Sequence, residues 1–167
     1  MPRTEVAVIP GSFDPLTNGH MDLITRTLSI FDRVIVGVIS NPAKSCLFTI
    51  EERMALIRGC CAAFGDRLAV GSFSGLLVDY LKQVGTLVMV RGLRAISDFD
   101  YEAQMALINK RLSPEVETFF LVAREENSYV SSSLVRQIAP LGGDVSKLVP
   151  PLVEAALKRK FFGDSAT

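Results

Sequence analysis

Short apolar runs alternate with helix-like segments along most of this chain. Five runs have the length of a strand: 6–9, 34–39, 68–70, 87–90 and 116–122. Because these runs are continuously apolar, each is expected to be a strand that is buried on both faces. Four segments between the runs show helical periodicity: 20–30, 49–63, 75–83 and 98–112. This alternation predicts an α/β fold with a parallel sheet and right-handed crossovers.

Two further helices are expected after the last strand. One runs from about residue 131 to the glycines 142 and 143, and the other begins at the prolines 150 and 151. Glycine is frequent just past helix ends and proline in first turns. No linker, low-complexity tract or repeat divides the 167 residues, and a chain of this size buries about 70% of its unfolded surface. We therefore expect a single domain over residues 1–167.

A loop rich in turn residues follows the first apolar run. Residues 10–20 read PGSFDPLTNGH and end at His20, the only histidine of the chain. A strand that leads into a helix start leaves backbone N–H groups unpaired at the positive end of the helix dipole, and this arrangement attracts anions. The same residues could form an ordinary connection between a strand and a helix. With a hydroxyl at Ser12 and an imidazole at His20, the loop favours a phosphate site with a proton donor.

Ligands of open parallel sheets bind beyond the carboxyl ends of the strands. Candidate phosphate-binding residues follow three further runs: Lys44 after the second, Arg91 and Arg94 after the fourth, and serines 131–133 after the fifth. Two guanidinium groups around a glycine can clamp phosphate oxygens through paired hydrogen bonds. In the alternative interpretation the two arginines bridge to nearby acids, which are Asp98, Asp100 or Glu102. Beside the first loop, phosphate binding at one rim of the sheet is the favoured interpretation.

Composition limits the class of protein. The 18 basic and 18 acidic residues give a net charge of zero, which argues against a nucleic-acid or membrane partner because those need a field of one sign. No run approaches the roughly 18 apolar residues of a membrane span, and the first residues are too polar for a signal peptide. The three cysteines are odd in number and two are adjacent, as expected for reduced thiols rather than disulfides. A cytoplasmic location is expected.

Four motifs, in order, resemble those of the bacterial phosphopantetheine adenylyltransferases, members of the nucleotidylyltransferase superfamily with its T/H-x-G-H signature. They are PGSFDPLTNGH, NPAK before FTIEER, RGLRAISDFDYE and YVSSSLVR. The resemblance implies a nucleotidylyltransferase domain with a Rossmann-like, doubly wound parallel sheet of five strands and helices on both faces. It also implies transfer of AMP from ATP to 4′-phosphopantetheine, which gives dephospho-coenzyme A and pyrophosphate in coenzyme A biosynthesis. A homohexamer is implied as well.

The resemblance also implies roles for individual positions. His20 would stabilise the transition state, with Lys44 and Arg91 as the other catalytic side chains. ATP would contact Ser12, Phe13, His20, Gly92, Leu93, Arg94, Glu102, Asn127, Ser128, Tyr129, Val130, Ser131, Ser132 and Ser133. Phosphopantetheine would contact Ser12, Lys44, Leu77 and Arg91. Two positions depart from the family: Ser12 replaces a frequent threonine and keeps the hydroxyl, whereas Asn127 replaces a frequent aromatic residue near the adenine.

The implied reaction needs no nucleophilic side chain. A phosphate monoester, with a second pKa of about 6, is largely ionised at pH 7 and can attack the α-phosphorus directly, in line and without a covalent enzyme intermediate. The residues must position two polyanions and stabilise the developing charge. Mg²⁺ is expected to arrive on the ATP phosphates, so no cluster of protein ligands is expected for it. Two alternatives stay open: another small-molecule nucleotidylyltransferase, acting on glycerol phosphate or nicotinamide mononucleotide, and a non-catalytic ATP-binding sensor.

Overall fold

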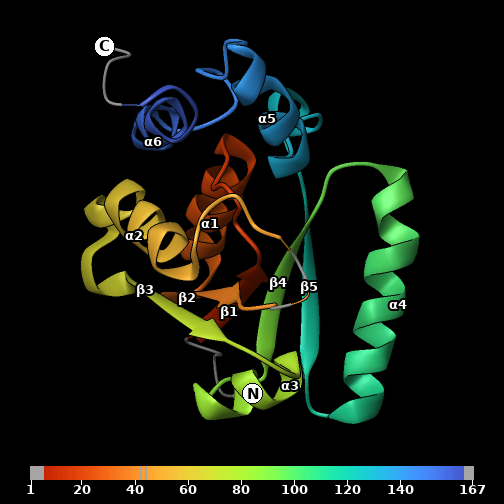
Figure 1. The fold of residues 1–167 in the computed structure, drawn as a ribbon. Coiled ribbons are helices and arrows are strands. Elements are labelled where there is room, and N and C mark those ends of the chain that lie inside the picture. The colour runs from red at the N-terminus through yellow and green to blue at the C-terminus, as the bar shows by residue number, and fades with distance from the viewer. Residues whose placement is uncertain (1–5, 42, 44, 164–167) are drawn as a thin grey trace.

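A parallel sheet forms the centre of the computed structural model, which describes residues 6–41, 43 and 45–163 (Figure 1). Within these residues it has five strands: β1 (Val6–Gly11), β2 (Arg33–Ile39), β3 (Leu68–Phe73), β4 (Val88–Leu93) and β5 (Glu117–Val122). Their order is β3-β2-β1-β4-β5, and every neighbouring pair is parallel. The five-stranded parallel sheet expected from the apolar runs is therefore confirmed.

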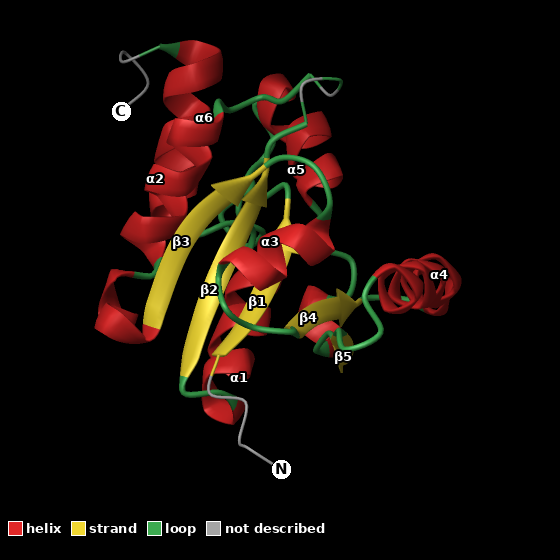
Figure 2. Ribbon diagram, turned by 90° about the horizontal axis from the view of Figure 1, so that it is seen from below, coloured by secondary structure: helices red, strands yellow, loops and turns green. Residues whose placement is uncertain are grey.

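Helices cover both faces of this sheet. The α-helices are α1 (Asn18–Ile30), α2 (Ile50–Cys60), α3 (Leu77–Gln83), α4 (Ile96–Leu112), α5 (Ser132–Ile138) and α6 (Pro151–Phe162). Because side chains alternate along a strand, Ile9 of β1 packs in a core with α1, α2, α5 and α6, whereas Val8 packs in a second core with α3. Figure 2 shows α4 beyond β4 and β5, to the side of the other helices. The doubly wound arrangement is confirmed.

Several element ends differ from the sequence-based expectation. Strand β4 was expected at 87–90 but continues through Arg91 and Gly92 to Leu93, because this segment pairs in register with Phe120–Val122 of β5. The helix expected at 49–63 ends at Cys60 and is followed by a 3-10 segment, Ala62–Arg67, in which Gly65 has a φ of 54°. The helix expected up to residue 142 is α5 followed by a 3-10 turn, Ala139–Leu141. Backbone pairing and local turns are not visible in hydrophobic periodicity.

Helix α4 leaves a large apolar area in contact with solvent. Four of its residues form what we call the α4 surface: Tyr101, Leu107, Ile108 and Leu112. They are half or more exposed, and Leu107 reaches 71%. Exposed apolar side chains that gather on one helix are a candidate interaction surface. In the part of the chain that the structure describes, no helix is both long and apolar enough to cross a bilayer.

Candidate active site

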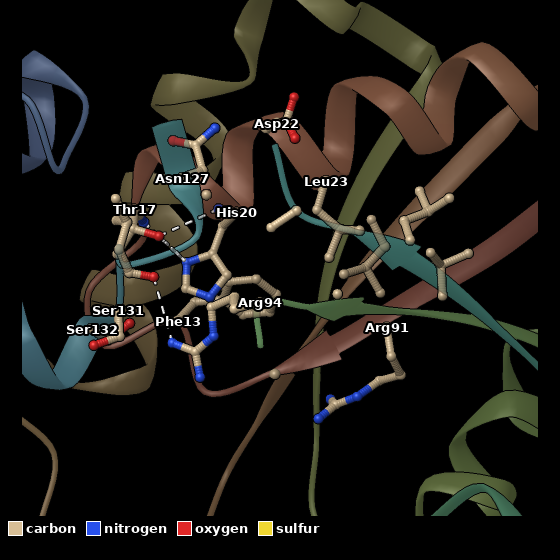
Figure 3. Close-up of a pocket in the computed structure, with 18 of the residues that line it drawn as sticks. Phe13, Thr17, His20, Asp22, Leu23, Arg91, Arg94, Asn127, Ser131 and Ser132 are labelled. Atoms are coloured by element: carbon tan, nitrogen blue, oxygen red, sulfur yellow. Dashed lines mark hydrogen bonds between the residues drawn. The ribbon is translucent and has the colours of Figure 1, made fainter. Parts of the chain in front are cut away.

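A cavity of about 530 Å³ opens where β1, β4 and β5 end (Figure 3). Strand β1 lies between β2 and β4, so the chain leaves β1 and β4 toward opposite faces of the sheet and an opening is left between the two connections. Ligands of doubly wound sheets bind at this switch point. The lining comes from the end of β1 and the loop after it, the first three turns of α1, and the ends of β4 and β5. Glu102 of α4 and the segment from β5 to the start of α5 complete it.

The start of α1 presents His20 to this cavity. The Oγ1 of Thr17, the N-cap, accepts a hydrogen bond from the His20 N–H at 3.3 Å, and the Thr17 N–H donates to Nδ1 of His20 at 3.0 Å. This reciprocal pairing is a capping box with an imidazole in the place that Glu or Gln usually takes. Because a backbone N–H can only donate, Nδ1 carries no hydrogen. The imidazole is therefore neutral, with its remaining hydrogen on Nε2.

Burial and charge keep the His20 ring neutral. The pKa of His20 is lowered from 6.5 to about 4, first by burial and then by the positive charges of Arg94 and Arg91. The ring of Phe13 lies edge-on against the imidazole, with centroids 4.9 Å apart. No acidic residue occupies the first turn of α1, so the positive end of its dipole is not offset there. His20 can thus donate a hydrogen bond to an anion without itself being charged.

Arg91 and Arg94 line the cavity, and both are also bridged to acids. Arg91 donates through Nε and Nη2 to the two carboxylate oxygens of Glu102, at 2.8 and 2.6 Å, and through Nη1 to the Pro10 carbonyl at 2.8 Å. The Nε of Arg94 lies 3.3 Å from the Oδ2 of Asp98. The two interpretations of these arginines are therefore compatible: each guanidinium is held by an acid and still borders the cavity.

Three successive serines complete the opposite wall. Ser131 is the N-cap of α5 and accepts from the Leu134 N–H at 3.1 Å. Ser132 donates to the Pro15 carbonyl at 2.8 Å and so connects this wall to the first loop. Figure 3 shows the Arg94 guanidinium on the side of these serines and Arg91 across the cavity from it. Hydroxyl and guanidinium groups from two separate segments are thus available to one polyanion.

Most of the residues expected at the site meet in this cavity. Its lining includes Ser12, Phe13, His20, Arg91, Gly92, Arg94, Glu102, Asn127, Val130, Ser131, Ser132 and Ser133. Four expected residues do not line it: Leu77, Leu93, Ser128 and Tyr129. Leu77 packs at the start of α3 against the second core, on the other face of the sheet, and Tyr129 is largely exposed. Lys44 lies outside the described residues.

Sequence reasoning missed an acidic group on α1. Asp22 lines the cavity and bridges to Arg26 at 3.3 Å and to Arg124 at 3.2 Å. Arg26 also donates to the Val122 carbonyl at 2.8 Å and so ties α1 to the end of β5. The spacing of Asp22 and Arg26, four residues apart on one helix face, was a visible signal for the first pair. The Arg124 contact spans about a hundred residues and had none.

The same lining offers few ligands for a metal ion. In the described segments, no three or more His, Cys, Asp or Glu side chains gather in a way that could hold one. The two carboxylates of the cavity, Asp22 and Glu102, are each paired with arginine. This donor set fits a metal ion that arrives already bound to phosphate oxygens and keeps water ligands, as Mg²⁺ does on nucleotides.

The chain belongs to the cytidylyltransferase-like family, whose model matches residues 8–138. Within that class it groups with the phosphopantetheine adenylyltransferases. The enzyme of that name from Thermotoga neapolitana is 54% identical over 155 residues, which cover 93% of this chain and 96% of the relative. Those from Alkaliphilus metalliredigens and Heliobacterium modesticaldum are each 51% identical, over 93% and 96% of this chain and 99% and 94% of the relative.

Solved structures confirm the fold. A bifunctional NMN adenylyltransferase/ADP ribose pyrophosphatase from Francisella tularensis matches with a TM-score of 0.70 and 15% identity, over 93% of this chain and 49% of that one. A putative nicotinate-nucleotide adenylyltransferase from Vibrio parahaemolyticus matches with a TM-score of 0.65 and 17% identity, over 91% of this chain and 97% of that one. At such identities the likeness concerns the Rossmann-like fold alone.

Proposed function

We propose that the protein transfers AMP from ATP to 4′-phosphopantetheine and releases pyrophosphate, giving dephospho-coenzyme A. One observation carries the proposal. The neutral imidazole of His20 lies at a helix start whose positive dipole end is not offset by an acid, and it faces the same cavity as two arginines and three serines from distant segments. This arrangement suits a reaction in which two polyanions must be brought together. The relatives that are 51–54% identical over the aligned residues carry the name of this activity.

The reaction follows from the substrate rather than from a protein nucleophile. The ionised phosphate of 4′-phosphopantetheine attacks the α-phosphorus of ATP in line, one P–O bond forms, and the bond to the leaving pyrophosphate breaks. The Nε2–H of His20 donates to an α-phosphate oxygen as negative charge builds up there. Arg91, Arg94 and Lys44 reduce the repulsion between the substrates. Mg²⁺, carried on the ATP phosphates, would neutralise part of the charge of the leaving group.

Two groups of residues are proposed to hold the substrates. For ATP they are Ser12, Phe13, His20, Gly92, Leu93, Arg94, Glu102 and the segment 127–133. For the phosphopantetheine side they are Ser12, Lys44, Leu77 and Arg91. Twelve of these border one cavity, which supports a common site. At Asn127 the carboxamide replaces the aromatic ring frequent in the family, so contact with the adenine there would be polar.

Assembly and location are proposed on separate grounds. We propose a homohexamer of single nucleotidylyltransferase domains from the family resemblance, with the α4 surface, which exposes apolar side chains, as a candidate contact between copies. We also propose that the protein works in the cytoplasm, where its three free cysteines stay reduced. Sedimentation of the wild type and of a Leu107→Glu variant tests the first proposal, and an unchanged oligomeric state in that variant would argue against the α4 surface.

The activity is tested by incubating the protein with ATP, Mg²⁺ and 4′-phosphopantetheine and measuring dephospho-coenzyme A and pyrophosphate. Pantetheine without its phosphate is the matched control, and it should give neither product. Glycerol phosphate and nicotinamide mononucleotide are tested in parallel as acceptors. Pyrophosphate released only with one of these would replace the proposed acceptor. ATP binding without pyrophosphate from any acceptor would indicate a nucleotide sensor instead of an enzyme.

A further inference from the structure

We propose that Arg53 is a positioning residue that turns backbone N–H groups of the loop after β1 toward the phosphates. This inference rests on the proposed function, because it assumes that phosphates occupy the cavity. Arg53 lies on α2, does not line the cavity, and carries no role in the resemblance to known enzymes. Its contacts nevertheless reach the centre of the first loop.

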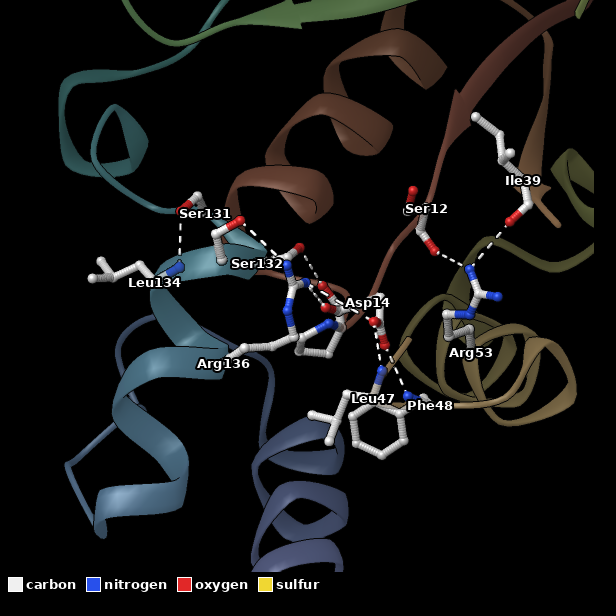
Figure 4. Close-up of polar contacts among 12 residues, drawn as sticks. Ser12, Asp14, Ile39, Leu47, Phe48, Arg53, Ser131, Ser132, Leu134 and Arg136 are labelled. Atoms are coloured by element: carbon white, nitrogen blue, oxygen red, sulfur yellow. Dashed lines mark hydrogen bonds and ion pairs between the residues drawn. The ribbon is translucent and has the colours of Figure 1, made fainter. Parts of the chain in front are cut away.

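Side chains from other elements hold the carbonyl groups of this loop (Figure 4). The Ser12 carbonyl accepts from Nη1 of Arg53 at 2.8 Å. Its neighbours accept in the same way: Pro10 from Arg91, Asp14 from Arg136 and Pro15 from Ser132. Four donors from β4, α2 and α5 thus turn the carbonyls of the loop toward the protein. With these four carbonyls held in this way, N–H groups at the start of the loop are left for a ligand.

The geometry of one peptide bond links Arg53 to the cavity. In a planar trans peptide, the C=O and the following N–H point in opposite directions. Holding the Ser12 carbonyl on the Arg53 side therefore turns the Phe13 N–H away from Arg53. Across the described residues, neither Ser12 N–H nor Phe13 N–H has a hydrogen-bond acceptor, although both residues line the cavity.

Phe13 adopts the backbone conformation expected of an anion-binding turn. Its φ of 49° makes it the one non-glycine residue with a positive φ in the described part of the chain. Such a conformation is strained for a bulky residue and persists only where the surroundings hold it. Turns that include a left-handed residue bring successive N–H groups to one concave side, where anions bind. Arg53 on the preceding carbonyl is one of the contacts that maintain it.

The charge of Arg53 adds to this effect. The residue is only 4% exposed, and its guanidinium donates to three carbonyls, those of Ser12, Ile39 and Thr49. No carboxylate of the described residues forms an ion pair with it; the pairs found there involve other cations. A buried cation without an acid partner is costly to stability. Here its positive charge lies directly behind the proposed phosphate loop, where a bound phosphate would offset it.

The test monitors the Phe13 N–H directly. The chain contains the dipeptide Ser-Phe twice, at Ser12–Phe13 and Ser72–Phe73. Labelling serine with ¹³C at the carbonyl and phenylalanine with ¹⁵N therefore leaves two amide signals in a carbonyl-filtered spectrum, and Phe73, in β3, is an internal reference for folding. Inorganic pyrophosphate is added to the wild type and to Arg53→Lys, Arg53→Met and Arg58→Met. Arg58→Met is the matched control, because Arg58 on the same helix also donates to a carbonyl, that of Val70.

Pyrophosphate is expected to shift the Phe13 signal of the wild type and of Arg58→Met and to leave Phe73 in place. In Arg53→Lys, whose single ammonium cannot reproduce the fork of donors, the dissociation constant for pyrophosphate should rise about tenfold, the effect of one lost hydrogen bond. In Arg53→Met the shift should disappear, and kcat/KM for 4′-phosphopantetheine should fall about 100-fold through misplacement of the loop.

Two results would overturn the inference. One is a Phe13 signal that does not respond to pyrophosphate in the wild type. The other is an Arg53→Lys variant whose dissociation constant for pyrophosphate and kcat/KM for 4′-phosphopantetheine equal those of the wild type. If Arg53→Met loses the Phe73 signal, and hence its fold, the Arg53→Lys variant alone decides the question. A wild type that makes no dephospho-coenzyme A but keeps the Phe13 response refutes only the proposed function and leaves the role of Arg53 standing.

Discussion

Helices α1 and α2 begin with the same hydrogen-bonded device in different surroundings. In α1 the box joins Thr17 to His20, and in α2 it joins Thr49 to Glu52, with the Thr49 N–H donating to the carboxylate at 2.8 Å. The first turn of α2 also carries Glu51, so two acids offset its dipole, whereas the first turn of α1 has none. The dipole of α2 is therefore offset by its own acids, whereas the start of α1 keeps a positive potential that can attract an anionic ligand.

A capping motif can therefore be separated from its usual electrostatic role. Both boxes satisfy two backbone N–H groups that would otherwise lack partners. Only the glutamate adds a negative charge, and Glu52 further pairs with Lys160 at 3.0 Å on the surface. The neutral imidazole keeps the cap and still points a donor into the cavity. Variants that exchange these properties test whether the distinction matters for function.

The largest effect is expected from His20→Ala. Removing the Nε2–H takes away a donor to the developing charge on the α-phosphate, and loss of one such donor typically lowers kcat by about 10²- to 10³-fold. Substrate affinities should change much less, because the arginines and serines remain. Steady-state kinetics of pyrophosphate release measure both. An unchanged kcat in this variant would refute the role proposed for the imidazole.

His20→Glu gives α1 the capping box of α2. The helix start should remain capped, and the melting temperature should stay close to that of the wild type. A carboxylate facing the triphosphate should nevertheless raise the KM for ATP about tenfold, as expected for a like charge worth roughly 1.4 kcal/mol. His20→Gln, with the same shape and no charge, is the matched control. Equal KM values for the two variants would mean that the charge at this position has no influence on ATP.

The titration of His20 is a third way to separate the two helix starts. Because the chain has one histidine, its ring protons give an unambiguous NMR signal, and the midpoint should lie near the pKa of about 4. Arg94→Met should raise this pKa, since a nearby positive charge is lost. In the unfolded chain the ring binds its proton near pH 6.5. Between pH 6.5 and 4 the unfolded state therefore holds more protons, and the free energy of unfolding should fall as the pH falls. A midpoint near 6.5 in the folded protein would contradict the lowered pKa.

The smallest effect is expected from Glu52→Gln. The hydrogen bond from Thr49 and the pairing with Lys160 lower the pKa of Glu52, so its charge stabilises the fold above the ordinary glutamate pKa and ceases to do so as the pH falls through the lowered value. The side chain is 43% exposed, and the loss at pH 7 should be a few tenths of a kcal/mol. Urea unfolding at pH 7 and pH 3 measures it, with a smaller difference expected at pH 3. A lowered kcat would show that the charge of Glu52 influences the reaction as well as stability.

Local patterns were sufficient for the sheet and for most of the lining of the cavity. The five strands could be predicted because short, continuously apolar runs are typical of strands buried on both faces. His20, Arg94 and the serines could be predicted because they follow strand ends. The extension of β4 over Arg91 and Gly92 was missed, since polar and glycine residues weaken a strand pattern while register with β5 overrides it.

Residues that act across the fold could not be found in this way. Arg53 looks like an ordinary charged position of a helix, and its contact with the Ser12 carbonyl spans 41 residues. The tautomer of His20 depends on a backbone N–H that only coordinates reveal. Leu77, implied by the family, lies on a core-facing position of α3, and its proposed contact with substrate stays a prediction. Such roles depend on contacts between segments that are distant in the sequence.

The pairing of Arg91 with Glu102 bears on how a reaction cycle ends. The guanidinium of Arg91 already donates hydrogen bonds to the Glu102 carboxylate and the Pro10 carbonyl. It therefore attracts an arriving anion less strongly than an unpaired arginine would. Polyanionic products are the species that an unopposed cation would retain longest. Because its charge is already partly offset by Glu102, Arg91 is expected to align a reactant while holding a polyanionic product less tightly than an unpaired arginine would.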